Sequence, residues 1–402
     1  MPFKSTAPPP SYRATVAALS VGQIICWAAL YYTFSSFVLP MQRSLGWSQP
    51  ELMGAFTVGL AVWGATTYAV GAAIDQGRGR RVMTLGAALA GMGFLLWSQV
   101  TTLPMLYGTW AILGASMAMT LYEPAFNVLT KRFPDRYVRG ITTLTLVGGF
   151  ASTLSFPVAA WMLSLWGWRG AALGIGCVLL LVVTPLHAWA LRGTPELPIR
   201  KISSDAASHE RSDATLHQAL REPSFWLLTA SFTFYSFAAA SLWAHLMPAF
   251  AAKGRTEVQA LAVVVWFGPA QVLGRFLHLW LGQSVSPRSL GLAVLGGLPV
   301  SLAIFALADH TAALLLFALL FGFANGLVTI VRGSLVPDYF GRANVGRISG
   351  AMAGISLMAR AAAPLSTAWL LLTLPGYREL LLVLSGVGAA ALMAFALAKR
   401  PL

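Results

Sequence analysis

Long apolar runs, separated by short groups of charged, proline and glycine residues, dominate the pattern of this chain. Each run has about 20 residues, which as an α-helix would cross about 30 Å of hydrocarbon. The runs are continuous rather than alternating, so the pattern excludes a membrane β-barrel. It predicts an all-α integral membrane protein with twelve transmembrane helices. The predicted helices lie near residues 14–40, 51–74, 82–100, 104–130, 140–165, 169–191, 224–249, 258–283, 289–308, 311–336, 347–373 and 378–398.

A single long polar stretch divides the runs into two groups of six. We therefore predict an N-terminal six-helix bundle at 1–192, a linker at 193–222 with a short amphipathic helix at its end, and a C-terminal six-helix bundle at 223–402. Shifting the chain by 208 residues aligns matching residues at corresponding helix ends, which indicates two parallel, pseudo-symmetric halves. The matching pairs are Arg13/Arg221, Pro40/Pro248, Gly46/Gly254, Arg80/Arg288, Gly114/Gly322, Arg139/Arg347, Trp161/Trp369 and Arg192/Arg400.

The composition agrees with a membrane protein, because 57% of residues are hydrophobic and 10% are charged, against about 25% charged residues in soluble domains. The net charge of +14 would indicate a nucleic-acid partner in a soluble chain. Here most basic residues lie at helix ends on the side of both termini, which marks that side as cytoplasmic. We therefore expect no nucleic-acid partner, and a multi-pass protein of a bacterial-type inner (plasma) membrane.

The sequence lacks the residue patterns of common enzymes. There is no P-loop for ATP, and the Gly-x-Ser-x-Gly and HExxH patterns are absent. The two cysteines, Cys26 and Cys177, both fall inside apolar runs, so we predict neither a disulfide framework nor a metal cluster. We expect a protein without cofactors that is not an enzyme and that works as a monomer in the lipid bilayer.

The loop between the second and third predicted helices carries a motif. Residues 71–81, Gly-Ala-Ala-Ile-Asp-Gln-Gly-Arg-Gly-Arg-Arg, resemble the signature loop of the major facilitator superfamily, and Arg139-Gly140, Pro157 and the Gly-Trp-Arg at 167–169 strengthen the resemblance. The resemblance covers the whole chain and implies two six-helix bundles that work by alternating access. It implies a gating role for Asp75, Arg80 and Arg81.

Finer features are most similar to the branch that contains monocarboxylate and oxalate/formate transporters. These are the spacing from Asp75 to Arg80-Arg81, the pair Tyr31-Tyr32, and Gly274-Arg275. Two departures stand out: Gln76 replaces a usual basic residue, and Gln283 stands where the second half would match Asp75. The separation of Gly148-Gly149 from Pro157 also differs from the drug/proton antiporter signature.

Ionisable residues inside the predicted helices are site candidates, because a charge in hydrocarbon costs at least about 2.5–3.5 kcal/mol. Arg275 and Arg360 each lie 13 residues from the arginine that ends their helix on the cytoplasmic side, hence at similar depth. The resemblance places basic residues of the oxalate/formate branch on these two helices. A carboxylate substrate would match their planar forks, and the alternative for each arginine is a structural ion pair.

Other polar residues complete the predicted site. Gln271 shares a helical face with Arg275 and stands where proton-coupled relatives carry an acid, so His278 is the candidate proton acceptor on that helix. Asn325 and Arg332 lie on one polar stripe, and Tyr31 and Tyr32 would orient a carboxylate.

Glu123, the only acid inside a predicted helix and away from its ends, belongs to a polar stripe with Ser116, Thr120 and Asn127. A salt bridge from Glu123 to Arg332 would serve either as a latch released by protonation or as a permanent structural pair.

The leading hypothesis is a secondary transporter of a small organic anion, a mono- or dicarboxylate. Its transport would be coupled either to protons or to exchange. The alternative is an exporter of amphipathic or cationic compounds in which Glu123 recognises the cation. A third hypothesis is a non-transporting nutrient sensor, which ranks last because we find no appended signalling domain.

Overall fold

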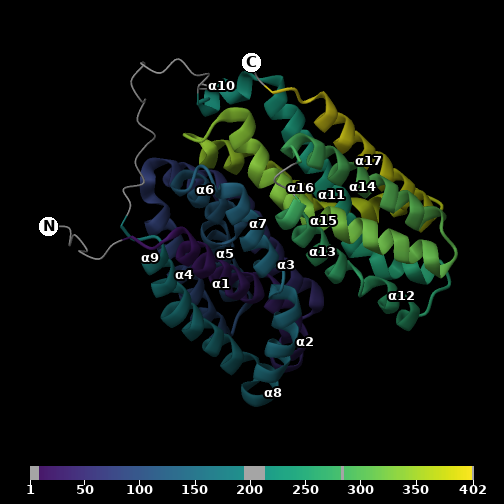
Figure 1. Ribbon diagram of the computed structural model, residues 1–402. Helices are drawn as coiled ribbons and strands as arrows, with labels where there is room; N and C mark the ends of the chain where they lie inside the picture. Colours follow the sequence, from purple (N-terminus) through teal and green to yellow (C-terminus); the bar gives the residue numbers. More distant parts are fainter. Residues whose placement is uncertain (1–8, 194–212, 282–284, 401–402) are drawn as a thin grey trace. The chain divides into compact units, whose positions relative to one another are not determined.

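The computed structural model describes residues 9–193, 213–281 and 285–400, and the regular structure in these ranges is helical (Figure 1). Helices of the first half are α1 (Tyr12–Trp27), η1 (Ala28–Tyr32), α2 (Thr33–Leu45), α3 (Gln49–Ala73), η2 (Ile74–Arg78), α4 (Gly79–Ser98), α5 (Leu103–Thr120), α6 (Tyr122–Arg132), α7 (Tyr137–Gly148), α8 (Ala151–Val178), η3 (Leu179–Val183) and α9 (Thr184–Ala190). Those after the linker are α10 (Leu216–Arg221), α11 (Pro223–Ala252), α12 (Glu257–Val264), α13 (Phe267–Leu281), α14 (Pro287–Leu307), α15 (Thr311–Phe340), α16 (Val345–Leu371) and α17 (Tyr377–Leu397).

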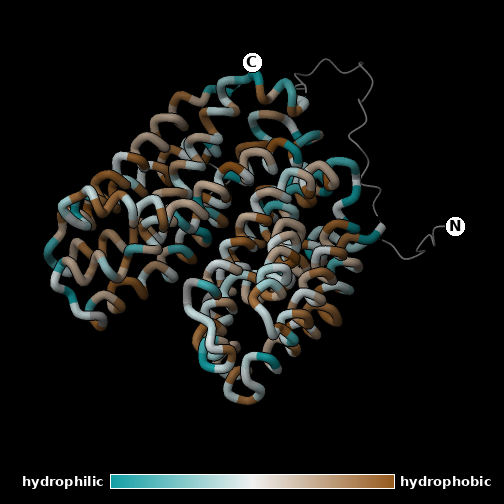
Figure 2. Tube along the Cα trace, turned by 180° about the vertical axis from the view of Figure 1, so that it is seen from behind, coloured by the Kyte–Doolittle hydropathy of each residue, from teal (hydrophilic) through white to brown (hydrophobic). Residues whose placement is uncertain are grey.

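Nine helical stretches among the described residues are long and apolar enough to cross a membrane. Two of them, Glu51–Ser98 and Leu154–Ala190, each overlap two of the predicted spans. The predicted span at 104–130 is divided into α5 and α6. These observations are consistent with twelve crossings. Apolar colours follow the helices in Figure 2, and hydrophilic residues gather where the chain turns.

The chain divides into two compact units. Unit 1 comprises Met1–Ala214 and Gly341–Gly354, and unit 2 comprises Thr215–Phe340 and Ile355–Leu402. The chain therefore passes between units at the end of the linker, before α16, and again within α16. The predicted boundaries place all of α16 in the C-terminal bundle, whereas its first residues are grouped with unit 1.

The repeat of 208 residues has a structural counterpart at the helix ends. Gly46 and Gly254 both adopt left-handed backbone conformations, with φ of 73° and 70°. Gly46 follows the last residue of α2, and Gly254 follows Lys253, the C-cap of α11. A side chain is strained in this conformation, so glycine is favoured at both turns. Arg80 donates to the Ala188 carbonyl at 2.9 Å, and Arg288 donates to the Ala396 carbonyl at 2.7 Å, again with the same offset.

The predicted span at 104–130 is broken at Leu121, whose extended backbone ends α5 and begins α6. Pro124 explains the break, because proline lacks the N–H that would bond to the Thr120 carbonyl and its ring clashes there. Gln23 of α1 fills the gap: its Nε2 donates to the carbonyls of Thr120 at 2.6 Å and Leu121 at 3.3 Å. A buried amide thus satisfies the backbone groups that the break exposes.

Candidate functional site

Helices α13 and α15 cross in unit 2 at two glycines, Gly322 and Gly326. A Cβ atom on Gly322 would lie 2.7 Å from the Phe267 carbonyl oxygen, and one on Gly326 would lie 2.8 Å from the Gln271 Cα. This spacing of small residues four apart lets two helix backbones approach closely in a membrane. The predicted residue Gln271 therefore lies at the crossing, and Asn325 precedes Gly326.

Arg275 lies one helical turn beyond Gln271 on α13. Its side chain is nearly inaccessible, since the residue is 5% exposed, and its Nε donates to the Gly326 carbonyl oxygen at 2.9 Å. Side chains of helices point back toward the N-terminus, which explains how Arg275 reaches Gly326. This bond fixes the plane of a buried guanidinium group. The structure thus brings Gln271, Arg275 and Asn325 together.

The other predicted residues of unit 2 are placed on neighbouring turns. His278 is half-buried on α13, and Arg332 is half-buried on α15, further along from Gly326. Arg360 is half-buried on α16, one turn before the proline inside that helix, Pro364.

In unit 1 the predicted tyrosines lie on a π-helical turn, η1. In a π-helix each hydrogen bond spans five residues instead of the four of an α-helix, and such turns are frequent at functional sites. The Tyr31 and Tyr32 rings contact each other with centroids 5.3 Å apart, and Trp27 packs against Tyr31 at 5.5 Å and against Tyr122 at 4.9 Å. The two tyrosines therefore belong to an aromatic cluster within unit 1.

Glu123 is half-buried in the first turn of α6. The N-terminus of a helix favours a negative charge, so the break at Leu121 places this acid where its carboxylate is stabilised. The predicted polar stripe is interrupted at the same point. The hydroxyls of Ser116 and Thr120 donate to carbonyls of their own helix, whereas the Asn127 side chain accepts a hydrogen bond from Ser349 at 3.1 Å.

The signature loop forms η2, where Gly77 adopts a left-handed conformation with φ of 76°. The carboxylate of Asp75 accepts hydrogen bonds from the backbone N–H groups of Gly346 at 2.9 Å and Arg347 at 2.7 Å, and Lys131 Nζ lies 3.0 Å from it. A carboxylate at the start of α16 satisfies N–H groups that have no partner within the helix.

Two glycines allow this contact. A Cβ atom on Gly71 would lie 1.9 Å from the Gly346 carbonyl oxygen, so only a backbone without side chains fits there. Arg80 instead holds the end of α9 through Ala188, and Arg81 is exposed. The structure brings Asp75 to the start of α16 and directs Arg80 elsewhere.

The comparisons with known proteins follow the same lines. The family model described as "Major Facilitator Superfamily" matches residues 19–298, which is more than half of the chain. The chain belongs to the major facilitator superfamily. It is a multi-pass membrane transporter rather than an enzyme, and its all-α fold is that of this superfamily.

Relatives of this major facilitator superfamily chain include monocarboxylate transporter 13 of Rattus norvegicus, 26% identical over 338 residues that cover 79% of this chain and 76% of the relative. The oxalate:formate antiporter of Oxalobacter formigenes is 24% identical over 225 residues, covering 55% of this chain and 51% of the relative. The crystal structure of the human organic anion transporter MFSD10 (TETRAN) has the same fold, with a TM-score of 0.75 at 16% identity over 96% of this chain and 100% of that one.

Three residues of this major facilitator superfamily chain were missed by the sequence analysis. Lys131 pairs with Asp75 from 56 positions away, and no local pattern reveals such a pair. Gln23 supports the break at Leu121, and Pro124 causes it. Pro124 is the one with a sequence signal, because a proline frees the carbonyl four residues earlier.

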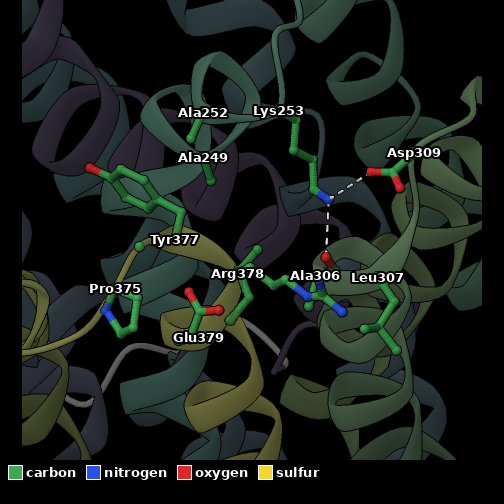
Figure 3. A pocket seen from close by; sticks show the side chains of 12 residues that line it. Ala249, Ala252, Lys253, Ala306, Leu307, Asp309, Pro375, Tyr377, Arg378 and Glu379 are labelled. Carbon is green, nitrogen blue, oxygen red and sulfur yellow. Dashed lines mark hydrogen bonds and ion pairs between the residues drawn. The ribbon is translucent and has the colours of Figure 1, made fainter.

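A separate pocket of about 600 Å³ lies in unit 2 where α11, α14 and α17 end or begin. Figure 3 shows Lys253 directed toward Ala306 and Asp309. Its Nζ donates to the carbonyls of Ala306 at 3.0 Å and Ala308 at 2.9 Å, and it lies 3.8 Å from the Asp309 carboxylate. Lys253 thereby caps the end of α14, and the pocket contains none of the predicted site residues.

Proposed function

We propose that this transporter moves a small organic anion, a mono- or dicarboxylate, by alternating access. The observation that carries the proposal is Arg275, a nearly inaccessible guanidinium group held in one orientation by the Gly326 carbonyl. A charge inside a membrane is costly, so a buried arginine of this kind marks a candidate site for a substrate of opposite charge. The names of the relatives, monocarboxylate transporters and an oxalate:formate antiporter, support the same substrate class.

In this proposal Arg275 and Arg360 bind the carboxylate, because both belong to unit 2 and arginine's planar fork matches two carboxylate oxygens. Gln271 and Asn325, at the crossing of α13 and α15, add neutral hydrogen bonds that orient the substrate. Tyr31 and Tyr32 contribute phenol groups from unit 1 and add no charge.

Arg332, Glu123 and His278 have a different proposed role, which is to couple transport to protons or to exchange. Each carries or can carry a charge inside the membrane, and Glu123 lies in the first turn of α6. Gating belongs to Asp75 together with Lys131, since their contacts hold the start of α16. We assign Arg80 and Arg81, which follow in the same signature loop, to gating as well.

The orientation is part of the proposal. Basic residues gather on the side of both termini, so we place both termini in the cytoplasm and the protein in a bacterial-type inner membrane. Fusion of a fluorescent protein that folds only in the cytoplasm should give fluorescence at either terminus. Dark fusions at both termini would reverse the assignment.

The substrate class is tested by uptake into proteoliposomes with radiolabelled formate, lactate, oxalate and succinate, with and without a pH gradient. We expect at least one of these anions to be carried. Charge-assisted hydrogen bonds contribute about 1.5–3 kcal/mol, so Arg275→Gln and Arg360→Gln should each reduce the uptake rate about ten- to a hundredfold. Arg221→Gln, which removes an exposed arginine of unit 2, is the matched control and should leave uptake unchanged.

The competing hypothesis of a cation exporter makes the opposite prediction. If a lipophilic cation such as tetraphenylphosphonium were transported by both arginine variants and its transport were abolished by Glu123→Gln, the anion proposal would be wrong.

A further inference from the structure

Two places where the chain passes between the units are hydrogen-bonded to each other. Unit 1 ends at Ala214 in the linker and resumes at Gly341 before α16. The Asp213 carboxylate accepts hydrogen bonds from the backbone N–H groups of Arg342 at 2.6 Å and Ala343 at 3.1 Å. Asn344 returns a bond, since its Nδ2 donates to the Ala214 carbonyl at 2.9 Å. The last residues of the linker are thus fastened to residues 341–344, which we call the crossing loop.

The crossing loop and the residues after it are also held by Lys131 and by Asp75 of the signature loop. Lys131 Nζ donates to the Ala343 carbonyl at 2.9 Å, and Asp75 accepts hydrogen bonds from the N–H groups of Gly346 and Arg347. Two carboxylates from distant parts of unit 1 therefore satisfy four backbone donors within six residues. Asp213 takes the first two and Asp75 the last two.

Gly341 is required for this arrangement. Its φ of 79° is strained for any residue with a side chain, and a Cβ atom there would lie 2.2 Å from Asp213 Oδ1. On the linker side, the chain is fixed immediately after Asp213, because Thr215 and Gln218 form a capping box that begins α10. The two chain segments that form the contact are thus each constrained by their own local structure.

We propose that Asp213 is a positioning residue of the transport cycle. By fixing the crossing loop, it presents the N–H groups of Gly346 and Arg347 to Asp75. Alternating access requires the chain to change conformation where it passes between the units, so a bond at two of these passages biases the equilibrium between transport states. The linker then contributes directly to gating, through one carboxylate.

Hydrogen exchange of the full-length protein in nanodiscs tests this proposal without any substrate. In Asp213→Ala, peptides that cover Arg342 and Ala343 should exchange about tenfold faster, and those that cover Gly346 and Arg347 about threefold faster. Asp213→Asn keeps an acceptor oxygen and should fall between Ala and wild type. Asp135→Asn removes an exposed acid from another loop of unit 1 and should match wild type.

Coupling between the two carboxylates is the decisive measurement. Coupling free energies are reciprocal, so Asp75→Asn should speed exchange at Arg342 and Ala343 as well. If Asp213→Ala changes exchange at Arg342 and Ala343 alone, Asp213 is a local cap and the proposal is wrong. A fall in the unfolding temperature that accounts for faster exchange across the whole of unit 1 would overturn it too.

Transport provides the functional readout, with radiolabelled formate as the probe. A positioning role predicts that Asp213→Asn changes the maximal uptake rate at least about threefold while the KM stays within about twofold. An unchanged maximal rate would overturn the role in the cycle. Should wild type carry no formate, the proposed substrate class loses support, and the exchange measurements still decide the role of Asp213.

Discussion

The crossing of α3 with α5 in unit 1 and that of α13 with α15 in unit 2 are related by the 208-residue repeat. In unit 1 a Cβ atom on Gly114 would lie 2.1 Å from the Gly59 carbonyl oxygen, and in unit 2 one on Gly322 would lie 2.7 Å from that of Phe267. Glycine and its backbone neighbour are thus kept at matching positions in both halves. Close helix contact is a requirement of the scaffold, independent of what each half binds.

The residues two turns further along differ. Thr67 in unit 1 donates to the Trp63 carbonyl of its own helix at 2.6 Å, whereas the matching Arg275 in unit 2 donates to Gly326 on the neighbouring helix. A hydroxyl can be satisfied locally, but a guanidinium group cannot. Both halves therefore keep the backbone contact between the two helices, and only unit 2 has a charged side chain, Arg275, next to that contact.

The largest expected effect comes from breaking the shared contact. Gly114→Ala should lower the free energy of unfolding by about 2–3 kcal/mol and Gly322→Ala by about 1–2 kcal/mol, because the added methyl group meets backbone in both cases and more closely in unit 1. Thermal unfolding in detergent, followed by tryptophan fluorescence, measures both. Gly108→Ala on α5, where a Cβ atom has nothing within 4 Å, is the control and should be neutral or stabilising. A larger loss for Gly322→Ala would contradict the ranking.

A smaller effect is expected at the arginines that hold the last helix of each half. Arg288 donates to the Tyr339 hydroxyl at 2.9 Å as well as to the Ala396 and Ala398 carbonyls, and Arg80, which is exposed, donates to Ala188. Arg288→Ala should cost about 1–2 kcal/mol of stability and Arg80→Ala less than about 1 kcal/mol. The same unfolding assay compares them, and Arg288→Lys should recover part of the loss. Equal losses would show that the two ends depend on their arginines alike.

The smallest effect concerns Lys253, which matches the apolar Leu45 of unit 1 in the repeat. Burial lowers the pKa of Lys253, Asp309 raises it, and Arg378 and Arg255 lower it further. Because the folded pKa is below the unfolded value of about 10.4, the folded state binds fewer protons, so this group contributes a stability that rises as pH increases from the folded pKa to the unfolded one.

Unfolding temperatures of wild type and Lys253→Met, measured from pH 7 to 10.5, test this expectation. As pH rises, the unfolding temperature of wild type should increase by about 1–2 °C relative to that of Lys253→Met. A decrease of the wild-type unfolding temperature relative to the variant would show that the hydrogen bonds to Ala306 and Ala308 raise the pKa of Lys253 more than burial lowers it.

The helical fold follows from the sequence because run length and hydropathy alone decide that a segment crosses a membrane. The break at Leu121 required one more rule, the loss of a donor at Pro124. The repeat explains why α15 is continuous at the matching place, since Arg332 stands where unit 1 has Pro124.

Other features depend on tertiary contacts that no local pattern encodes. The pairing of Asp75 with Lys131 and the bonds from Asp213 join residues far apart in the chain. The grouping of the first residues of α16 with unit 1 is equally invisible, because the apolar run continues without a change through Gly354 and Ile355. For Gln271, Arg275 and Asn325, helical periodicity predicts which residues share a face of one helix. It does not predict that the two helices cross at Gly322 and Gly326.

The gap at Leu121 also bears on how the protein is made. Two carbonyl groups, those of Thr120 and Leu121, would face hydrocarbon without a donor if the segment entered the bilayer by itself, which is unfavourable. Their donor, Gln23, emerges from the ribosome about a hundred residues earlier, because synthesis proceeds from the N-terminus. The order of biogenesis therefore supplies the partner before the need arises, and a circular permutant that moved α1 to the end of the chain would insert this segment unprotected.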